Sequence, residues 1–111
     1  MSVEIRGVKE MQKMLKEVAS LKDIQNAVKV NTTEMHQKAS RRVPVDTGHL
    51  RRSLNVEFKD GGLTGRVYTD VEYGIYQEFG TRFQAGTPFM RPSLYEQRVK
   101  FMQDMSRLLK K

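Results

Sequence analysis

The sequence has no cysteine and no tryptophan, and only three of its 111 residues are proline. The absence of cysteine excludes disulfide frameworks, thiolate metal sites and cysteine nucleophiles. No apolar run approaches the roughly 18 residues that indicate a membrane-spanning helix. The N-terminal stretch also lacks the apolar segment of a secretory signal. We therefore expect a protein that is made in the cytoplasm and has no membrane contact.

Apolar residues are also scarce, at 38% of the chain, whereas 30% of the residues are charged. A chain of 111 residues is expected to form one domain with a modest core. Self-association would be a natural way to bury more surface. The formal net charge of +7 is compatible with an ordinary basic surface, or with an acidic partner such as nucleic acid or an acidic protein.

Hydrophobic spacing predicts two N-terminal helices after a short strand over residues 3–6. The first helix would present the apolar stripe Val8, Met11, Leu15 and Val18. The second would run from Asp23 to about Arg42 and end before Pro44, because the residue that precedes a proline avoids the α region. Its apolar stripe would comprise Ile24, Ala27 or Val28, Asn31, Met35 and Ala39. The two helices would form an antiparallel pair or one broken helix.

The middle of the chain reads as a β-hairpin that follows a short helical turn over residues 49–52. The turn signal is Asp60-Gly61-Gly62, and apolar residues alternate with polar ones on both sides of it. The alternating apolar residues are Leu54, Val56 and Phe58 on one side and Val67, Thr69 and Val71 on the other. One apolar face of this sheet should therefore cover a layer of helices.

Residues 73–79 predict two helical turns that end at Gly80 in the left-handed α conformation. Residues 80–87 show no periodicity, and we expect a flexible loop with Phe83 near its centre. That loop would order on binding a partner, or Phe83 would fold back onto the core. A long last helix would have Pro92 in its first turn and the stripe Leu94, Phe101 or Met102, Met105, and Leu108 or Leu109. We expect the following side chains to fix the short helix and the last helix against the sheet: Tyr73, Ile75, Tyr76, Phe79, Phe89 and Pro92.

These elements indicate one α+β domain over residues 1–111. A small antiparallel sheet, made of the central hairpin and one or two further strands, would pack against two N-terminal helices and a long C-terminal helix.

The sequence offers no catalytic constellation. His36 and His49 fall on different predicted elements, where exposed positions are expected, and a catalytic histidine needs a partner within reach. Glu72 and Glu78 do not share a helix face. The glycine-rich stretch 61–65 joins two strands and precedes no helix, so it is a hairpin loop and not a phosphate-binding loop. We therefore expect no enzymatic activity, no cofactor and no metal site.

A basic cluster carries a local charge of about +4, when Asp46 is counted against it. Its members are Lys38, Arg41, Arg42, Arg51 and Arg52. It could be a solvated helix end, a contact for an acidic protein, or a DNA contact. No aromatic residue for base stacking lies between Lys38 and Arg52.

Three blocks resemble a known family. They are Pro-Val-Asp-Thr-Gly-His-Leu-Arg-Arg-Ser-Leu at 44–54, Tyr-Gly-Ile-Tyr-Gln-Glu-Phe-Gly-Thr at 73–81, and Pro-Phe-Met-Arg-Pro-Ser-Leu at 88–94. In this order and at similar separations they resemble the small neck, tail-completion or head–tail joining proteins of long-tailed bacteriophages and prophages. Ser93 stands where alanine is more usual in that family. The resemblance covers about half of the chain and says little about residues 1–40.

The resemblance implies an α+β fold, no enzyme activity, and a structural role in the virion at the head–tail junction. It implies an oligomeric ring of this chain, expected to be a hexamer, with the connector and tail proteins as further partners and DNA contact possible in the channel. The residues that we expect to meet a partner are Gly61, Gly62, Arg82, Phe83, Gln84, Gly86 and Arg91. The alternative function is a basic nucleic-acid-binding module that uses the Lys38–Arg52 cluster.

Overall fold

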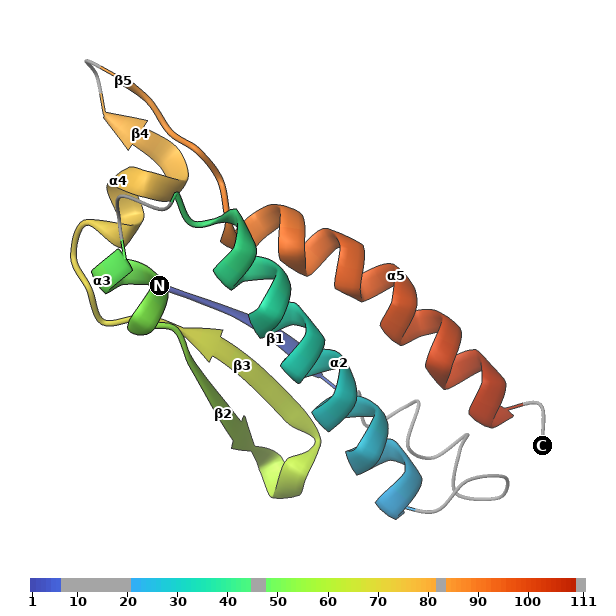
Figure 1. Cartoon of the computed structure of the whole chain (residues 1–111). Coiled ribbons are helices and arrows are strands. Elements are labelled where there is room, and N and C mark those ends of the chain that lie inside the picture. Colours follow the sequence, from blue (N-terminus) through green and yellow to red (C-terminus); the bar gives the residue numbers. More distant parts are fainter. Residues whose placement is uncertain (7–20, 45–47, 82–83, 110–111) are drawn as a thin grey trace.

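The computed structural model describes residues 1–6, 21–44, 48–81 and 84–109 (Figure 1). In chain order, its helices and strands are β1 (Ser2–Arg6), α2 (Leu21–Arg42), α3 (Gly48–Arg52), β2 (Asn55–Lys59), β3 (Thr64–Tyr68), α4 (Gly74–Phe79), β4 (Gly80–Thr81), β5 (Gln84–Ala85) and α5 (Met90–Leu109). The predicted α+β class is therefore confirmed. The first predicted helix, with Val8, Met11, Leu15 and Val18, lies outside the described residues.

β1, β3 and β2 form an antiparallel sheet in that order. Val3 and Val56 both lie opposite Val67, and the helices cover this face. Glu4 and Glu57 both lie opposite Arg66 on the other face, which carries charged pairs such as Lys59 with Glu4 at 2.8 Å. One face is thus apolar and the other polar, as side-chain alternation requires.

The predicted hairpin is confirmed, with its turn at Asp60–Gly62. Asp60, Gly61 and Gly62 adopt φ angles of 55°, 66° and 86°, a region in which glycine is favoured because it has no Cβ. Strand β3 ends at Tyr68, so Thr69 and Val71 follow the strand instead of belonging to it. Phe58, on the outer strand β2, is exposed.

Helices α2 and α5 run antiparallel, side by side, over the apolar face of the sheet (Figure 1). The predicted α2 stripe is confirmed, with Val28 and not Ala27 as the fully buried member, and its buried residues are Ile24, Val28, Asn31, Met35 and Ala39. In α5, Phe101 and Met105 are buried, while Met102 faces solvent. Pro92 lies in the first turn of α5, as predicted.

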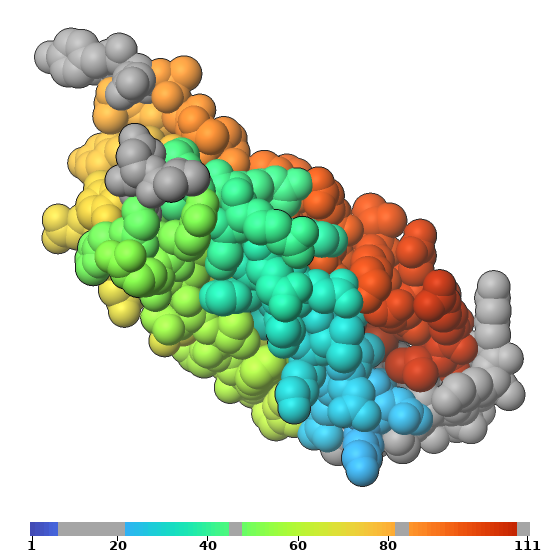
Figure 2. Space-filling model, viewed as in Figure 1, coloured from blue at the N-terminus to red at the C-terminus, as the bar shows by residue number. Residues whose placement is uncertain are grey.

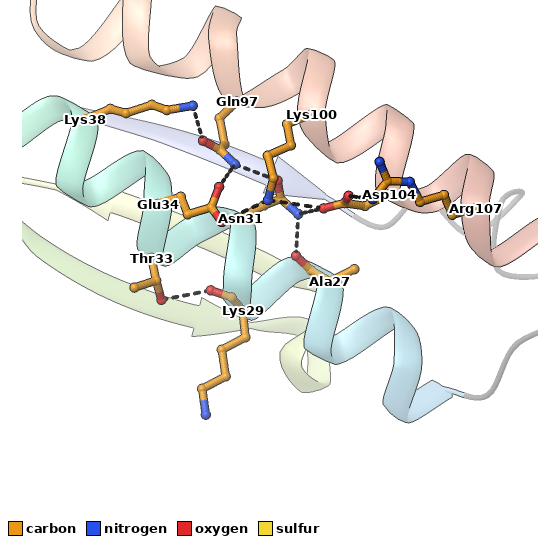
Figure 3. A network of polar contacts seen from close by, with 10 residues as sticks. All are labelled: Ala27, Lys29, Asn31, Thr33, Glu34, Lys38, Gln97, Lys100, Asp104 and Arg107. Carbon is orange, nitrogen blue, oxygen red and sulfur yellow. Dashed lines mark hydrogen bonds and ion pairs between the residues drawn. The ribbon is translucent and has the colours of Figure 1, made fainter.

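The α2–α5 interface contains buried polar side chains in addition to apolar ones (Figure 3). Gln97 Nε2 donates to Asn31 Oδ1 at 2.6 Å and to Glu34 Oε2 at 3.1 Å. Lys38 Nζ donates to Gln97 Oε1 at 2.8 Å, and Asn31 Nδ2 donates to Ala27 O at 2.8 Å. A buried amide that loses its partners destabilises the fold, so this network fixes how α5 lies along α2.

Candidate interaction surface on helix α4

Helix α4 is amphipathic, but its apolar side faces solvent instead of the core. Gly74 and Glu78 face the protein and are buried, whereas the apolar and aromatic side chains face solvent. The exposed fractions are 40% for Tyr73, 52% for Ile75, 60% for Tyr76 and 58% for Phe79. A surface helix normally directs its apolar stripe towards the core. We call these four residues the α4 surface.

This arrangement corrects the prediction that the α4 side chains anchor the short helix. Tyr73, Ile75, Tyr76 and Phe79 do not pack against the sheet. Phe89 is fully buried, as expected.

The Glu78 carboxylate attaches α4 to the start of α5. Its Oε1 accepts hydrogen bonds from the backbone N–H groups of Phe89 at 2.9 Å and Met90 at 2.7 Å. Its Oε2 accepts from the Arg91 backbone N–H and from Arg91 Nε, both at 3.1 Å. The first N–H groups of a helix have no partner within the helix, and the helix dipole favours a negative charge there. Glu78 therefore caps α5 from a different element.

The electrostatics of Glu78 follow from these contacts. Burial of the carboxyl favours its neutral form and on its own would raise the pKa. The hydrogen bonds from the Met90, Phe89 and Arg91 backbone, together with the Arg91 side chain, outweigh this effect and lower the pKa of Glu78. The carboxylate is therefore charged at neutral pH, and both of its oxygens accept hydrogen bonds.

Arg91 also links α4 to the start of α5. Besides its bond to Glu78, its guanidinium lies 4.4 Å from the centre of the Phe79 ring, a cation–π contact. A role for Arg91 in contacting a partner stays a prediction, and such a contact would have to coexist with these bonds or replace them.

Next to α4, strands β4 and β5 form a short antiparallel pair in which Gly80 lies opposite Ala85 and Thr81 opposite Gln84. The sequence showed no period here and predicted a loop. Gly80 does end α4 at a positive φ of 83°, but its ψ of −176° is extended and is not the predicted left-handed α value. A Cβ on Gly86 would lie 2.4 Å from Gly80 N, so Gly86 packs against the backbone of the α4 end.

The other predicted contact residues are distributed as follows. Arg82 and Phe83 lie outside the described residues, and Gln84 is part of β5. Gly61 O accepts a hydrogen bond from Gln25 Nε2 at 2.6 Å, and Gly62 lies beside the same side chain. The hairpin tip is thus joined to α2, and its partner role stays a prediction.

A groove of about 390 Å³ separates α4 from the β4–β5 pair. Tyr73, Tyr76, Ala85 and Gly86 are among its lining residues, and none of the described residues that line it is charged. The α4 surface therefore continues into this groove.

The basic cluster is largely committed to bonds within the chain. Besides the Lys38 bond to Gln97, Arg42 bonds Ser93 Oγ at 2.8 Å and also pairs with Glu96. Arg51 donates to the Val43 carbonyl at 2.6 Å. Arg41 and Arg52 remain exposed. The structure brings Lys38, Arg41 and Arg42 together with Glu96 around one hollow, so this patch includes a carboxylate.

The two histidines differ in their burial. His49 is exposed, as predicted. His36 is half-buried, which corrects its predicted exposure, because its Nε2 lies 3.0 Å from the Leu54 carbonyl oxygen. In the part of the chain that the structure describes, no three His, Asp or Glu residues are grouped as metal ligands.

Comparison with known proteins gave one family match. The family model described as "Bacteriophage HK97-gp10, putative tail-component" matches residues 7–80. No curated protein and no solved structure matched the chain. None of the helices among the described residues is long and apolar enough to cross a membrane.

Proposed function

Because the chain belongs to the HK97-gp10-like family of bacteriophage tail components, we propose that it is a structural protein of the head–tail junction. It would join or complete the tail at the capsid connector. It would act there as a subunit of an oligomeric ring, expected to be a hexamer, without enzymatic activity. Its partners would be other copies of the chain and the neighbouring connector and tail proteins.

The observation that carries this proposal is the reversed amphipathicity of α4. A soluble monomer rarely keeps an aromatic and aliphatic cluster exposed unless a partner covers it. Tyrosine, together with other aromatic residues, is enriched in the well-packed centres of protein interfaces. The α4 surface therefore has the composition of an interface core.

The test is assembly of tails and heads with an altered α4 surface. The variant Ile75→Asp/Tyr76→Asp places two charges on this surface without touching the Glu78 cap. We expect it to fold normally but to lose binding to purified tails or connectors and to yield few joined particles by electron microscopy.

The matched control is Val30→Asp, which changes an exposed apolar residue on α2, away from α4. It should assemble like the wild type. If the α4 variant supported joining as well as this control does, the α4 surface would not be the contact.

Nucleic-acid binding through the basic cluster has less support. Lys38, Arg42 and Arg51 already bond groups of the same chain, so fewer charges remain for phosphates.

A further inference from the structure

Seven of the nine large exposed apolar side chains of the described residues lie in two places. Four of them form the α4 surface. The other three are Tyr95, Val99 and Met102, which are 57%, 60% and 50% exposed. Their spacings of four and three residues place them in one row along α5. We call this row the α5 stripe.

The α5 stripe lies on the side of the helix that faces away from the core. Phe101 and Met105 mark the core side of α5, and at 100° per residue Val99 points roughly opposite to them. Helix α5 is therefore apolar on two sides. In its outer row, Met102 also borders strand β1, because it lines a hollow together with Ile5 and Arg6.

Exposed charges of opposite sign lie beside the two surfaces, although Arg91 also lies against the Phe79 ring and Glu96 is exposed next to Tyr95. The α4 surface is preceded by Asp70 and Glu72, which are both exposed. Arg98 flanks the α5 stripe and lines a hollow of about 710 Å³ together with Val99, Met102, Gln103, Ser106 and Arg107. The Arg107 guanidinium already pairs with Asp104 at 3.7 Å. A short helix with an apolar face and an acidic flank matches an apolar hollow that has Arg98 at its rim.

The two surfaces also lie on different sides of the molecule. Helix α4 is at the left end in Figure 1, whereas α5 forms the right flank, and Figure 2 shows the same separation between the yellow and the red atoms. Two different patches can join identical copies head to tail, and such contacts close into rings when the rotation allows.

We propose that the α4 surface of one copy binds the α5 stripe of the next copy, with Asp70 and Glu72 facing Arg98. This inference rests on the proposed ring and names the two surfaces that build it. The occupant of the α5 stripe is thus a second copy of this chain.

The test mixes two variants that each lack one surface. Ile75→Asp/Tyr76→Asp removes the α4 surface, and Val99→Asp/Met102→Asp removes the α5 stripe. By light scattering, the wild type should gain mass with concentration, and each variant alone should be a monomer. An equimolar mixture should form a heterodimer and nothing larger, because only one intact interface remains. Val30→Asp should behave like the wild type.

The absence of cysteine allows a direct check of which surfaces meet. A Tyr76→Cys chain mixed with a Val99→Cys chain should form a mixed disulfide dimer under mild oxidation. Neither chain should cross-link efficiently with itself.

Four results would overturn the inference. One is a wild type that stays monomeric at the highest soluble concentration. The second is a variant mixture that stays monomeric, and the third is preferential Tyr76→Cys self-linkage, which indicates a symmetric contact. The fourth is a large loss of thermal stability in monomeric Val99→Asp/Met102→Asp, which would mean that the chain itself covers the stripe.

The inference and the proposed function fail in different ways. If the α4 variant loses tail binding while the α5 variant keeps both tail binding and self-association, the proposed function stands and this pairing is wrong. If neither variant affects joining, the proposed function fails first.

Discussion

At the residue scale, Glu78 has a structural role that the sequence around it does not reveal. As an acidic residue in a short helix it reads as a solvent-exposed side chain. In the structure it is buried, and it accepts hydrogen bonds from three successive backbone N–H groups at the start of α5. Because these N–H groups come from residues 11 to 13 positions later, no local pattern around Glu78 reports them.

The first prediction concerns the substitution Glu78→Gln. Glutamine has one acceptor oxygen instead of two, and its NH2 group would face backbone donors. We expect the free energy of unfolding to fall by about 1–3 kcal/mol, the usual cost of leaving a buried polar group unpaired. Urea denaturation measures this change. The control Glu72→Gln, at an exposed carboxylate, should stay within about 0.5 kcal/mol of the wild type, and an equal loss in both variants would contradict the capping role.

The second prediction is the pH dependence of the same contact. The pKa of Glu78 is lower in the folded protein than its ordinary value. The folded state therefore favours the charged form of this carboxyl more than the unfolded state does. Its contribution to stability is complete above the unfolded pKa and is lost as the pH falls through the folded pKa. The difference in unfolding free energy between wild type and Glu78→Gln should therefore shrink below about pH 4.5. Urea midpoints between about pH 7 and pH 3 measure it, and a difference that does not change with pH would rule out the charged cap.

At the element scale, sequence patterns suffice to predict the long helix α2 and the hairpin. Helix α2 carries five buried stripe residues over 22 residues, so its apolar period decides both its existence and its orientation. The hairpin has alternation on both sides of a glycine turn, and only one face of each strand can be apolar. Long periodic segments of this kind determine their own packing.

Helix α4 shows where such patterns fail. It has six residues, with apolar side chains over its outer half and only Gly74 and Glu78 on the other side. A pattern-based prediction buries the apolar half, as ours did. The actual orientation of α4 depends on the hydrogen bonds between Glu78 and the start of α5. It also depends on the small size of Gly74, whose added Cβ would lie 3.3 Å from Thr69 Cγ2. The sequence does contain one indication of this orientation, because an α-helix over residues 74–79 places Gly74 and Glu78 together on one side.

The third prediction tests how closely α2 lies on the sheet. A Cβ on Gly65 would lie 1.7 Å from Thr32 Oγ1 and 2.7 Å from Thr32 Cβ. Gly65→Ala should therefore force β3 and α2 apart and lower the free energy of unfolding by about 1–3 kcal/mol, as overpacking does. Adding Thr32→Ala removes the nearest atom and should recover part of the loss in thermal denaturation.

The control for this prediction is Gly48→Ala. Among the described residues, its added Cβ would meet the flexible end of Arg52, at 3.3 Å. A Gly65→Ala protein as stable as Gly48→Ala would show that the helix and the sheet can separate at little cost.

At the scale of the whole molecule, the net charge of +7 is spread over a surface that already uses many of its basic groups. Among the described residues, Arg42, Lys59, Arg66, Arg91, Lys100 and Arg107 each pair with a carboxylate. The sequence alone counts every lysine and arginine as available, because pairing between distant elements is a tertiary property. The local charge of the Lys38–Arg52 cluster therefore overstates what an incoming anion would meet.

The last prediction uses this difference to separate a structural protein from a nucleic-acid-binding one. Each phosphate that a protein neutralises contributes about −0.9 to the slope of log K against log salt concentration for duplex DNA. If only Arg41 and Arg52 of the cluster are available, duplex binding through it should be weak, with a slope no steeper than about −2. Binding by all five basic residues would give about −4.5 instead.

Fluorescence anisotropy with a short duplex at several salt concentrations gives the slope. The variant Arg41→Gln/Arg52→Gln should abolish whatever binding the cluster supports, because the other three cations would have to leave Gln97, Ser93 and the Val43 carbonyl to reach phosphates. A steep slope that persists in this variant but disappears in Lys38→Gln would mean that the internal bonds open for DNA. In that case the cluster, and not the α4 surface, would be the principal binding site of the chain.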